Sequence, residues 1–171
     1  MRILIKTADE KKLLRKCGII FVIFVVLDQV TKCWVVAHPE LIRRPFIVIP
    51  NLFSIVSVRN TGAAWGMFNG NNILLFIVAL IAFFILIIFF RSITEQCRER
   101  YIALSLILSG IVGNSIDRIF RKSVVDFLDF YLGSYHWPAF NVADSAICIG
   151  VTLLVLSFLF RKQLQVDQAL K

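Results

Sequence analysis

Four long apolar stretches dominate the pattern of hydrophobic and polar positions along the chain. Charged segments or segments containing Pro and Gly separate them. A helix needs ~20 mostly apolar residues to cross the hydrocarbon of a bilayer, so each stretch predicts a transmembrane helix. The predicted spans are residues 18–36, 73–90, 101–120 and 140–160. This pattern predicts an all-α membrane protein that forms a single membrane domain over residues 1–171.

The segments between the spans differ in character. Residues 37–72 contain two short β-like runs, Phe46–Ile49 and Phe53–Val58, separated by Pro50-Asn51. They predict a small extracytoplasmic β-hairpin or sheet cradle that lies on the membrane. Residues 121–139 are rich in aromatic side chains and predict a second outer loop with a short interfacial segment. Residues 91–100 predict a short polar loop on the opposite side.

Composition agrees with a protein whose solvent is lipid. Hydrophobic residues make up 58% of the 171 residues, charged residues 18%, and the mean hydropathy is +0.81. A soluble domain of this length could not bury so much apolar surface. The net charge of +8 would suggest nucleic acid in a soluble protein, but here the basic residues flank the apolar stretches. The four cysteines form no CxxC pattern and are interpreted as small apolar fillers.

The distribution of Lys and Arg predicts the orientation. The two termini and residues 91–100 carry twelve of these residues, whereas the other side carries six. Positive residues concentrate on the cytoplasmic side, so both termini are expected there. Trp34, Trp65 and Trp137 then fall at the outer interface, which indole side chains prefer.

Some ionisable residues lie where hydrocarbon should reject them. An acid in mid-helix costs ~2.5–3.5 kcal/mol, so it needs a partner or a function. Asp28 and Lys32 are four residues apart and share a helix face. They form either a neutralising pair or a pair that orients neighbouring loops or contacts a substrate. A role for Lys32 as general base to a serine lacks any GxSxG or SxxK context.

A stripe of small and polar residues follows the third span. It recurs every four residues and predicts a face that packs inward, with Asn114, Asp117 and Arg118 at its outer end. Asp117 is either catalytic or part of a structural network with Arg118 or Arg121. The stripe consists of Ser105, Ser109, Gly113 and Asp117.

Two further acids converge at the same depth. Asp144 lies about one turn inside the fourth span, on one face with Asn141 and Ser145. Asp126 lies between Val125 and Phe127, which predicts a partly buried carboxyl with a raised pKa. Two such carboxyls can share one proton, activate water and bond a scissile carbonyl, which is aspartic peptidase chemistry. Asp129 is interpreted as a partner of this pair or as part of a solvated face. HExxH or similar metal-binding spacing is absent from the sequence.

Five motifs in order carry a family resemblance. They are Asp28-Gln29-Val30-Thr31-Lys32, Arg59-Asn60-Thr61-Gly62-Ala63-Ala64-Trp65-Gly66, Gly113-Asn114-Ser115-Ile116-Asp117-Arg118, Val124-Val125-Asp126-Phe127 and Phe140-Asn141-Val142-Ala143-Asp144. With these motifs and its four apolar stretches, the chain resembles lipoprotein signal peptidases (signal peptidase II) over about residues 18–160. One departure is Ser109, where the family often has a second glycine beside Gly110.

The resemblance implies an intramembrane aspartic endopeptidase of the bacterial inner membrane. Such enzymes remove signal peptides from prolipoproteins, cutting just before a cysteine that bears diacylglycerol. The implied partners are lipid-modified prolipoproteins and membrane lipid, without nucleic acid, and the chain is expected to act as a monomer without metal or cofactor. The implied catalytic pair is Asp126 and Asp144. Structural support is implied for Asp28, Lys32 and Asp117. The implied substrate-binding residues are Asn60, Gly62, Asn114, Arg118 and Asn141, with Ala63 and Ala64 in the substrate cradle.

Two readings from other classes stay open on the residues alone. A proton- or cation-coupled transporter also has membrane carboxylates, but it places them near the bilayer midplane. A non-catalytic scaffold would use polar faces only to hold helices together. It leaves the polar outer ends of three helices unexplained.

Overall fold

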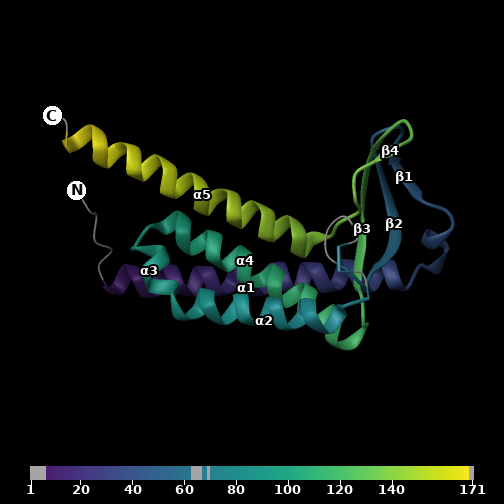
Figure 1. The fold of residues 1–171 in the computed structure, drawn as a ribbon, viewed down its shortest axis with the longest axis horizontal. Coiled ribbons are helices and arrows are strands. Elements are labelled where there is room, and N and C mark those ends of the chain that lie inside the picture. The colour runs from purple at the N-terminus through teal and green to yellow at the C-terminus, as the bar shows by residue number, and fades with distance from the viewer. Residues whose placement is uncertain (1–6, 63–66, 69, 170–171) are drawn as a thin grey trace.

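The computed structural model describes residues 7–62, 67–68 and 70–169. Long helices lie side by side along one axis, a β-sheet stands across one end of them, and the first and last described segments of the chain reach the other end (Figure 1). The α-helices of the described residues are α1 (Thr7–Val36), α2 (Asn72–Ile88), α3 (Phe90–Thr94), α4 (Arg98–Phe120) and α5 (Val142–Ala169).

Three helices in the described part of the chain are long and apolar enough to cross a membrane: α1, α4 and α5. Helix α2 is also apolar but has 17 residues, so the predicted count of four spans goes beyond this finding. Helix α1 begins at Thr7, well before residue 18. Its first two turns are polar, yet they consist of good helix formers with Asp9 and Glu10 at the favourable N-terminal end.

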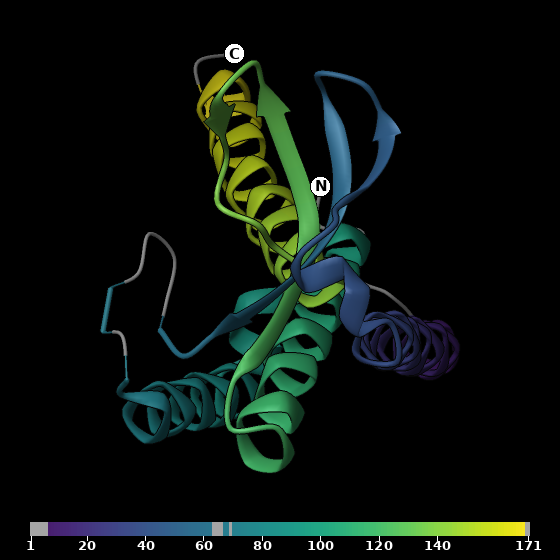
Figure 2. The same cartoon turned by 90° about the vertical axis from the view of Figure 1, so that its right-hand side faces the viewer.

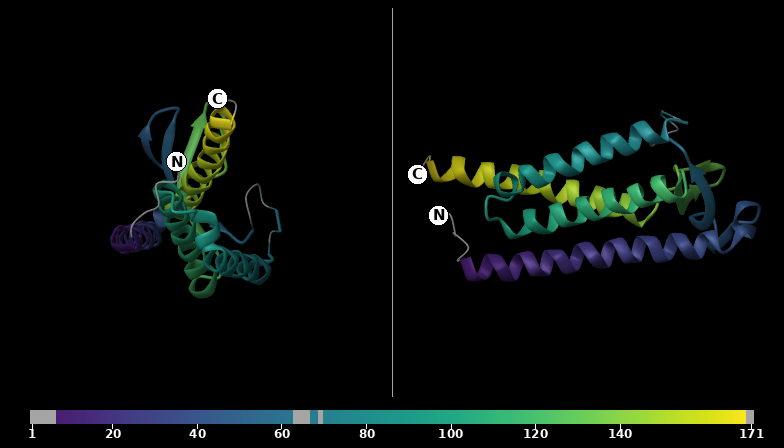
Figure 3. Two further views of the ribbon diagram at one scale, coloured as in Figure 1. Left: turned by 90° about the vertical axis from the view of Figure 1, so that its left-hand side faces the viewer. Right: turned by 90° about the horizontal axis from the view of Figure 1, so that it is seen from below.

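Helix α4 is the centre of the bundle. Seen end-on, α1, α2 and α5 surround it on different sides (Figure 2), and α4 packs against all three. The view from below in Figure 3 shows that α1, α4 and α2 lie alongside one another. The small-residue stripe predicted on the third span is buried: Ser109 and Asp117 are at most 1% exposed.

Glycines let α4 and α5 approach closely. A Cβ added at Gly110 would lie 2.3 Å from the backbone oxygen of Ala143, and one at Gly150 would lie 2.6 Å from that of Ala103. A methyl group cannot fit at either place without movement of a helix backbone. Close helix contacts of this kind are typical of small residues in membrane bundles. No sequence motif indicated the close contact at Gly150, which only the structure shows.

We expect Gly110→Ala to destabilise the fold by about 1–3 kcal/mol, since the added methyl must push α5 away from α4. Thermal unfolding of the purified protein in detergent measures the effect. Gly18→Ala is the matched control, because no atom lies within 4 Å of the Cβ position at Gly18. Equal unfolding temperatures for the two variants would contradict this account of the α4–α5 contact.

The sheet contains four described strands, and every neighbouring pair is antiparallel. The predicted hairpin is present as β1 (Phe46–Ile49) and β2 (Phe53–Asn60), with Asn51 in the turn at φ 60°. Strand β3 (Val124–Leu132) pairs with β2, and β4 (Tyr135–His136) pairs with β3.

The prediction of an outer loop over residues 121–139 is therefore wrong for its central part. Residues 124–132 form β3, which turns the hairpin into a larger sheet. The four side chains from Val124 to Phe127 are all buried, so the segment lacks the apolar–polar alternation by which a half-exposed strand is recognised. Its partner strand is also distant in sequence.

A small core joins the sheet to the helices. It consists of Val35 at the end of α1, Leu41 in the short 3-10 helix η1 (Pro39–Ile42), and Val125 and Phe127 of β3. Because Asp126 lies between two of these core residues, the packing fixes its backbone at the end of the bundle.

Candidate active site

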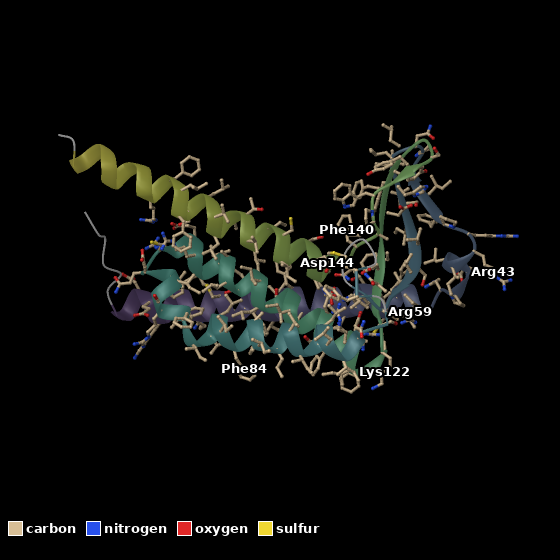
Figure 4. The ribbon with its side chains drawn as sticks, viewed as in Figure 1. Arg43, Arg59, Phe84, Lys122, Phe140 and Asp144 are labelled. Atoms are coloured by element: carbon tan, nitrogen blue, oxygen red, sulfur yellow. The ribbon has the colours of Figure 1, made fainter. Side chains whose placement is uncertain are left out.

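Asp126 and Asp144 line one cavity where the sheet meets the helices. The cavity has a volume of about 670 Å³. Figure 4 shows Asp144 and Phe140 at this junction, with Asp144 in the first turn of α5. The cavity is lined by Val58, Arg59, Asn60, Thr61 and Gly62 at the end of β2; Asn114 and Arg118 on α4; Val124 and Asp126 on β3; Trp137, Pro138, Ala139 and Phe140 before α5; and Asp144, Ile147 and Cys148 on α5.

The predicted site residues divide between this cavity and the layer behind it. The cavity lining includes Asn60, Gly62, Asn114 and Arg118 in addition to the two acids, and Asn141 is fully buried beneath it. Ala63, Ala64 and Trp65, also named by the sequence motif, lie outside the described residues. The wall formed by residues 137–140 and by Ile147 and Cys148 was not predicted.

A capping box at the start of α5 orients Asp144. The Oδ1 atom of Asn141 accepts a hydrogen bond from the backbone N–H of Asp144 at 2.9 Å. In return, Oδ2 of Asp144 accepts one from the backbone N–H of Asn141 at 3.2 Å. Such reciprocal bonds satisfy N–H groups that a helix start leaves free. The signal was present in the sequence as Asn-x-x-Asp before an apolar run.

Two side-chain amides connect the carboxylates. Asn141 donates from Nδ2 to Oδ1 of Asp126 at 2.7 Å, and Asn114 donates from Nδ2 to Oδ1 of Asp144 at 2.7 Å. Asn141 also donates to Oδ1 of Asn114 at 3.2 Å. On the other side, Asn60 donates to Oδ2 of Asp126 at 2.9 Å. These asparagines, for which substrate binding is predicted, hold the two acids in place.

The environment of Asp126 raises the pKa of its carboxyl. The residue is 3% exposed. Burial is the main reason that its pKa rises, repulsion by Asp144 adds to the effect, and together they bring the pKa to about 6 in spite of the bonds from Asn60 and Asn141. The sequence prediction of a raised pKa at Asp126 agrees with this value.

A pH-dependent stability difference follows for Asp126→Asn. The folded-state pKa is raised, so the wild-type protein loses stability as pH rises from about 4 through 6, when a buried charge forms. Asparagine does not ionise, so the stability of the variant relative to wild type should increase by about 2 kcal/mol between pH 4.5 and pH 8. Thermal unfolding at both pH values measures the difference. A stability difference between the variant and the wild type that does not change with pH would contradict a raised pKa of Asp126.

A buried ion network lies behind the cavity. Lys32 Nζ is 2.9 Å from Oδ2 of Asp28 and 3.2 Å from Oδ2 of Asp117. Asp117 also pairs with Arg121. The pairing of Asp28 with Lys32 on one helix face is thus as predicted.

Each acid of this network also holds the backbone beside a cavity acid. Asp117 accepts a hydrogen bond at 2.9 Å from the backbone N–H of Val125, the residue before Asp126. Asp28 accepts a hydrogen bond at 2.9 Å from the backbone N–H of Ala143, the residue before Asp144. Asp117 is thus a paired acid, and its structural role stays a prediction. Its partners are Arg121 and Lys32, whereas Arg118 lines the cavity and donates to the backbone oxygen of Gly62 at 3.3 Å.

Asp129 belongs to a separate buried cluster in the sheet. It accepts a hydrogen bond from Ser54 at 2.7 Å and pairs with His136 at 2.9 Å. It is 5% exposed, so the interpretation as a solvated residue is wrong. Its two partners come from the neighbouring strands, Ser54 from β2 and His136 from β4. Across the described residues, the acids, cysteines and histidines form no group of three or more that could hold a metal ion.

The motifs, the two acids in one cavity and the helical bundle can now be compared with known proteins. A family model described as signal peptidase (SPase) II matches residues 20–160. The chain belongs to the signal peptidase II family. The match covers every residue that lines the cavity.

Individual relatives agree with the family model. The chain is 38% identical over 141 residues to a lipoprotein signal peptidase of Bacillus pumilus, covering 82% of this chain and 90% of the relative. It is 44% identical over 145 residues to a lipoprotein signal peptidase of Geobacter metallireducens, covering 83% and 89%. Its fold is similar to that of a bacterial membrane enzyme solved by the in meso method at 2.3 Å resolution, with a TM-score of 0.79, 38% identity, and coverage of 86% of this chain and 89% of the other.

Proposed function

We propose that this protein is an aspartic endopeptidase that removes signal peptides from prolipoproteins whose cysteine carries diacylglycerol, cutting just before that cysteine. Family membership supports signal-peptide removal from prolipoproteins. The observation that carries the aspartic mechanism is the meeting of Asp126 and Asp144 in one cavity, each held by an asparagine amide. We call these two acids the dyad.

The proposed chemistry uses the two acids in different protonation states. Burial raises the pKa of Asp126 to about 6, and we assign to this carboxyl the shared proton and the bond to the scissile carbonyl oxygen. Ionised Asp144 takes a proton from a water molecule, whose oxygen attacks the carbonyl carbon. The proton gained by Asp144 then passes to the leaving nitrogen as the C–N bond breaks.

Other cavity residues position the peptide. Arg118 lies on the cavity wall beside the strip from Asn60 to Gly62 and donates to the backbone oxygen of Gly62. A substrate backbone lying along this wall would present its carbonyl groups to the Arg118 guanidinium. Asn114 and Asn141 keep the dyad in position beneath it.

We propose that the protein lies in the bacterial cytoplasmic membrane, with four spans and the site at the outer leaflet. Helix α2 has 17 residues, all apolar except Asn72, and a length of ~26 Å, which is close to the ~30 Å of a bilayer core. All four side chains of β1 are exposed and apolar, as are Trp34 and Trp137. These side chains fit a sheet that rests at the lipid surface. The dyad lies at one end of the bundle, which favours a peptidase over a transporter with midplane acids.

The orientation predicts the result of reporter fusions. A reporter after Lys171 or within residues 91–100 should be cytoplasmic, and one near Asn71 should be external, because the basic residues concentrate on the first side. Paired reporters that are active only in the cytoplasm or only outside it distinguish the two. A cytoplasmic signal near Asn71 would contradict the outer location of the dyad.

The direct test of the proposed function uses the purified chain of residues 1–171 in detergent or lipid. A synthetic prolipoprotein with diacylglyceryl on its cysteine is added without nucleotide and with a metal chelator. We expect cleavage at the bond before the modified cysteine, identified by mass spectrometry. Intact substrate after prolonged incubation with folded protein would overturn the proposal.

A further inference from the structure

Lys32 lies behind the dyad and contacts it through one side chain. The residue is fully buried. Its ammonium group lies within bonding distance of three oxygens: Asp28 Oδ2 at 2.9 Å, Asp117 Oδ2 at 3.2 Å and Asn114 Oδ1 at 2.9 Å. An ammonium has three donor hydrogens and no acceptor, so these contacts use its full capacity. Two of the partners are charged, and the third is a neutral amide that touches Asp144.

This third contact determines which way the Asn114 amide faces. A side-chain amide can present either its oxygen or its NH₂ group in a given direction. Lys32 only donates, so Oδ1 of Asn114 must face it. The NH₂ group is then turned toward Oδ1 of Asp144, to which it donates at 2.7 Å. The reverse orientation would place NH₂ against an ammonium and an oxygen against a carboxylate.

The same amide connects Lys32 to the second acid. Asn141 donates both to Oδ1 of Asn114 and to Oδ1 of Asp126. A charged donor polarises the amide that it contacts and strengthens the bonds beyond it. The charge of Lys32 also acts at longer range: burial and Asp144 raise the pKa of Asp126, whereas Lys32 opposes that rise.

We propose that Lys32 is a positioning residue for the dyad, acting through the side-chain amide of Asn114 on Asp144. Its ion pairs with Asp28 and Asp117 hold the ammonium in place, and this position allows it to donate the hydrogen bond to Asn114. This inference rests on the proposed function, because it concerns the proposed reaction of the dyad. It assigns to Lys32 an effect on turnover that a purely structural counter-ion does not have.

The first test is Lys32→Met, which keeps the length of the side chain and removes all three donors. We expect kcat per folded molecule to fall about 10–100-fold, since Asp144 loses its fixed partner, whereas KM stays close to wild type because the cavity walls are unchanged. The alkaline limb of the pH profile should move to higher pH, because the charge that lowers the pKa of Asp126 is gone.

A second variant covers the case in which Lys32→Met does not fold. The double variant Asp28→Asn/Lys32→Met removes one negative and one positive charge together, and asparagine retains an oxygen for the N–H of Ala143. We expect the loss in kcat to persist, because the bond to Asn114 is still missing. The shift of the alkaline limb should be smaller, since the two removed charges have opposite effects.

Arg121→Gln is the matched control. Arg121 is the other cation of the same network, but its partners are Asp117, Gln29 and Cys33. We expect the wild-type pH profile for this variant even where its stability decreases. Folded fractions are measured for every variant, so that kcat refers to folded protein.

The outcomes separate this inference from the proposed function. Wild-type kcat and pH profile in both folded Lys32 variants would overturn the positioning role and leave the proposed function standing. A shift in Arg121→Gln equal to that in Lys32→Met would also overturn it, because any cation of the network would then have the same effect. Failure of the wild-type chain to cleave the lipidated precursor would overturn the proposed function itself.

Discussion

Asp126→Asn and Asp144→Asn should each reduce cleavage of a lipidated prolipoprotein by at least about 10³-fold while the protein stays folded. An amide can neither take a proton from water nor share one with its neighbour, and acid–base groups contribute about 10²–10⁴-fold each. Because the two residues act as a unit, the double variant should be little worse than either single one. Initial rates on one precursor, normalised to folded protein, measure the loss.

Two other buried aspartates provide matched controls. Asp129→Asn makes the same change three residues along β3, where the carboxyl bonds Ser54 and His136 in the sheet, and it should retain most activity. Asp117→Asn should mainly reduce stability or expression, since Lys32 and Arg121 lose a charged partner in a buried site. A folded Asp117→Asn without activity, together with an active Asp126→Asn, would show that the dyad has been assigned to the wrong pair.

Removal of the lipid from the substrate should also have a large effect. We expect a precursor without diacylglyceryl to react at least about 100-fold more slowly than the modified one. The acyl chains stay in hydrocarbon and the glycerol near the headgroups, so the lipid fixes the depth of the adjoining peptide bond. Positioning effects reach ~7–11 kcal/mol in the best cases, and a 100-fold effect needs only about 2.7 kcal/mol.

The lining of the cavity fits this role of the lipid. Its wall changes from the polar strip around Asn60 and Gly62 to Ile147 and Cys148 on the apolar helix α5. A substrate could therefore place its peptide at the polar side and its lipid along the helix. The control precursor carries a small alkyl group on the same cysteine, which blocks the thiol without adding a membrane anchor. Equal rates for the three precursors would indicate a general membrane peptidase.

Much of the helical architecture could be predicted from local patterns. A run of about twenty apolar residues favours a helix, so the predicted ranges agree with α2 and α4 to within a few residues. The two outer ends differ more, because α1 begins at Thr7 rather than at residue 18 and α5 continues to Ala169 rather than ending at residue 160. The hairpin was also predicted correctly, because Pro50-Asn51 interrupts two β-rich runs and Asn51 tolerates the positive φ of the turn.

The sequence also identified the polar residues of the candidate site, but it did not determine the role of each one. Polar side chains in apolar helices stand out because lipid cannot solvate them, which singled out Asp28, Lys32, Asn114, Asp117 and Asp144. Whether Asp117 or Asp126 joins Asp144 depends on contacts far away in sequence. The structure places Asp117 between two cations and Asp126 in the cavity.

The sequence by itself determined the membrane class, the helices and the set of polar residues, because these depend on the length and composition of local segments. Only the tertiary structure decided the pairing of β3 with β2, the joint cavity of Asp126 and Asp144, and the direction in which Asn114 faces. Pairing between strands more than sixty residues apart leaves no periodic signal in either segment. The orientation of an amide is set by the donors and acceptors around it, and these come from α1, α4 and α5 together.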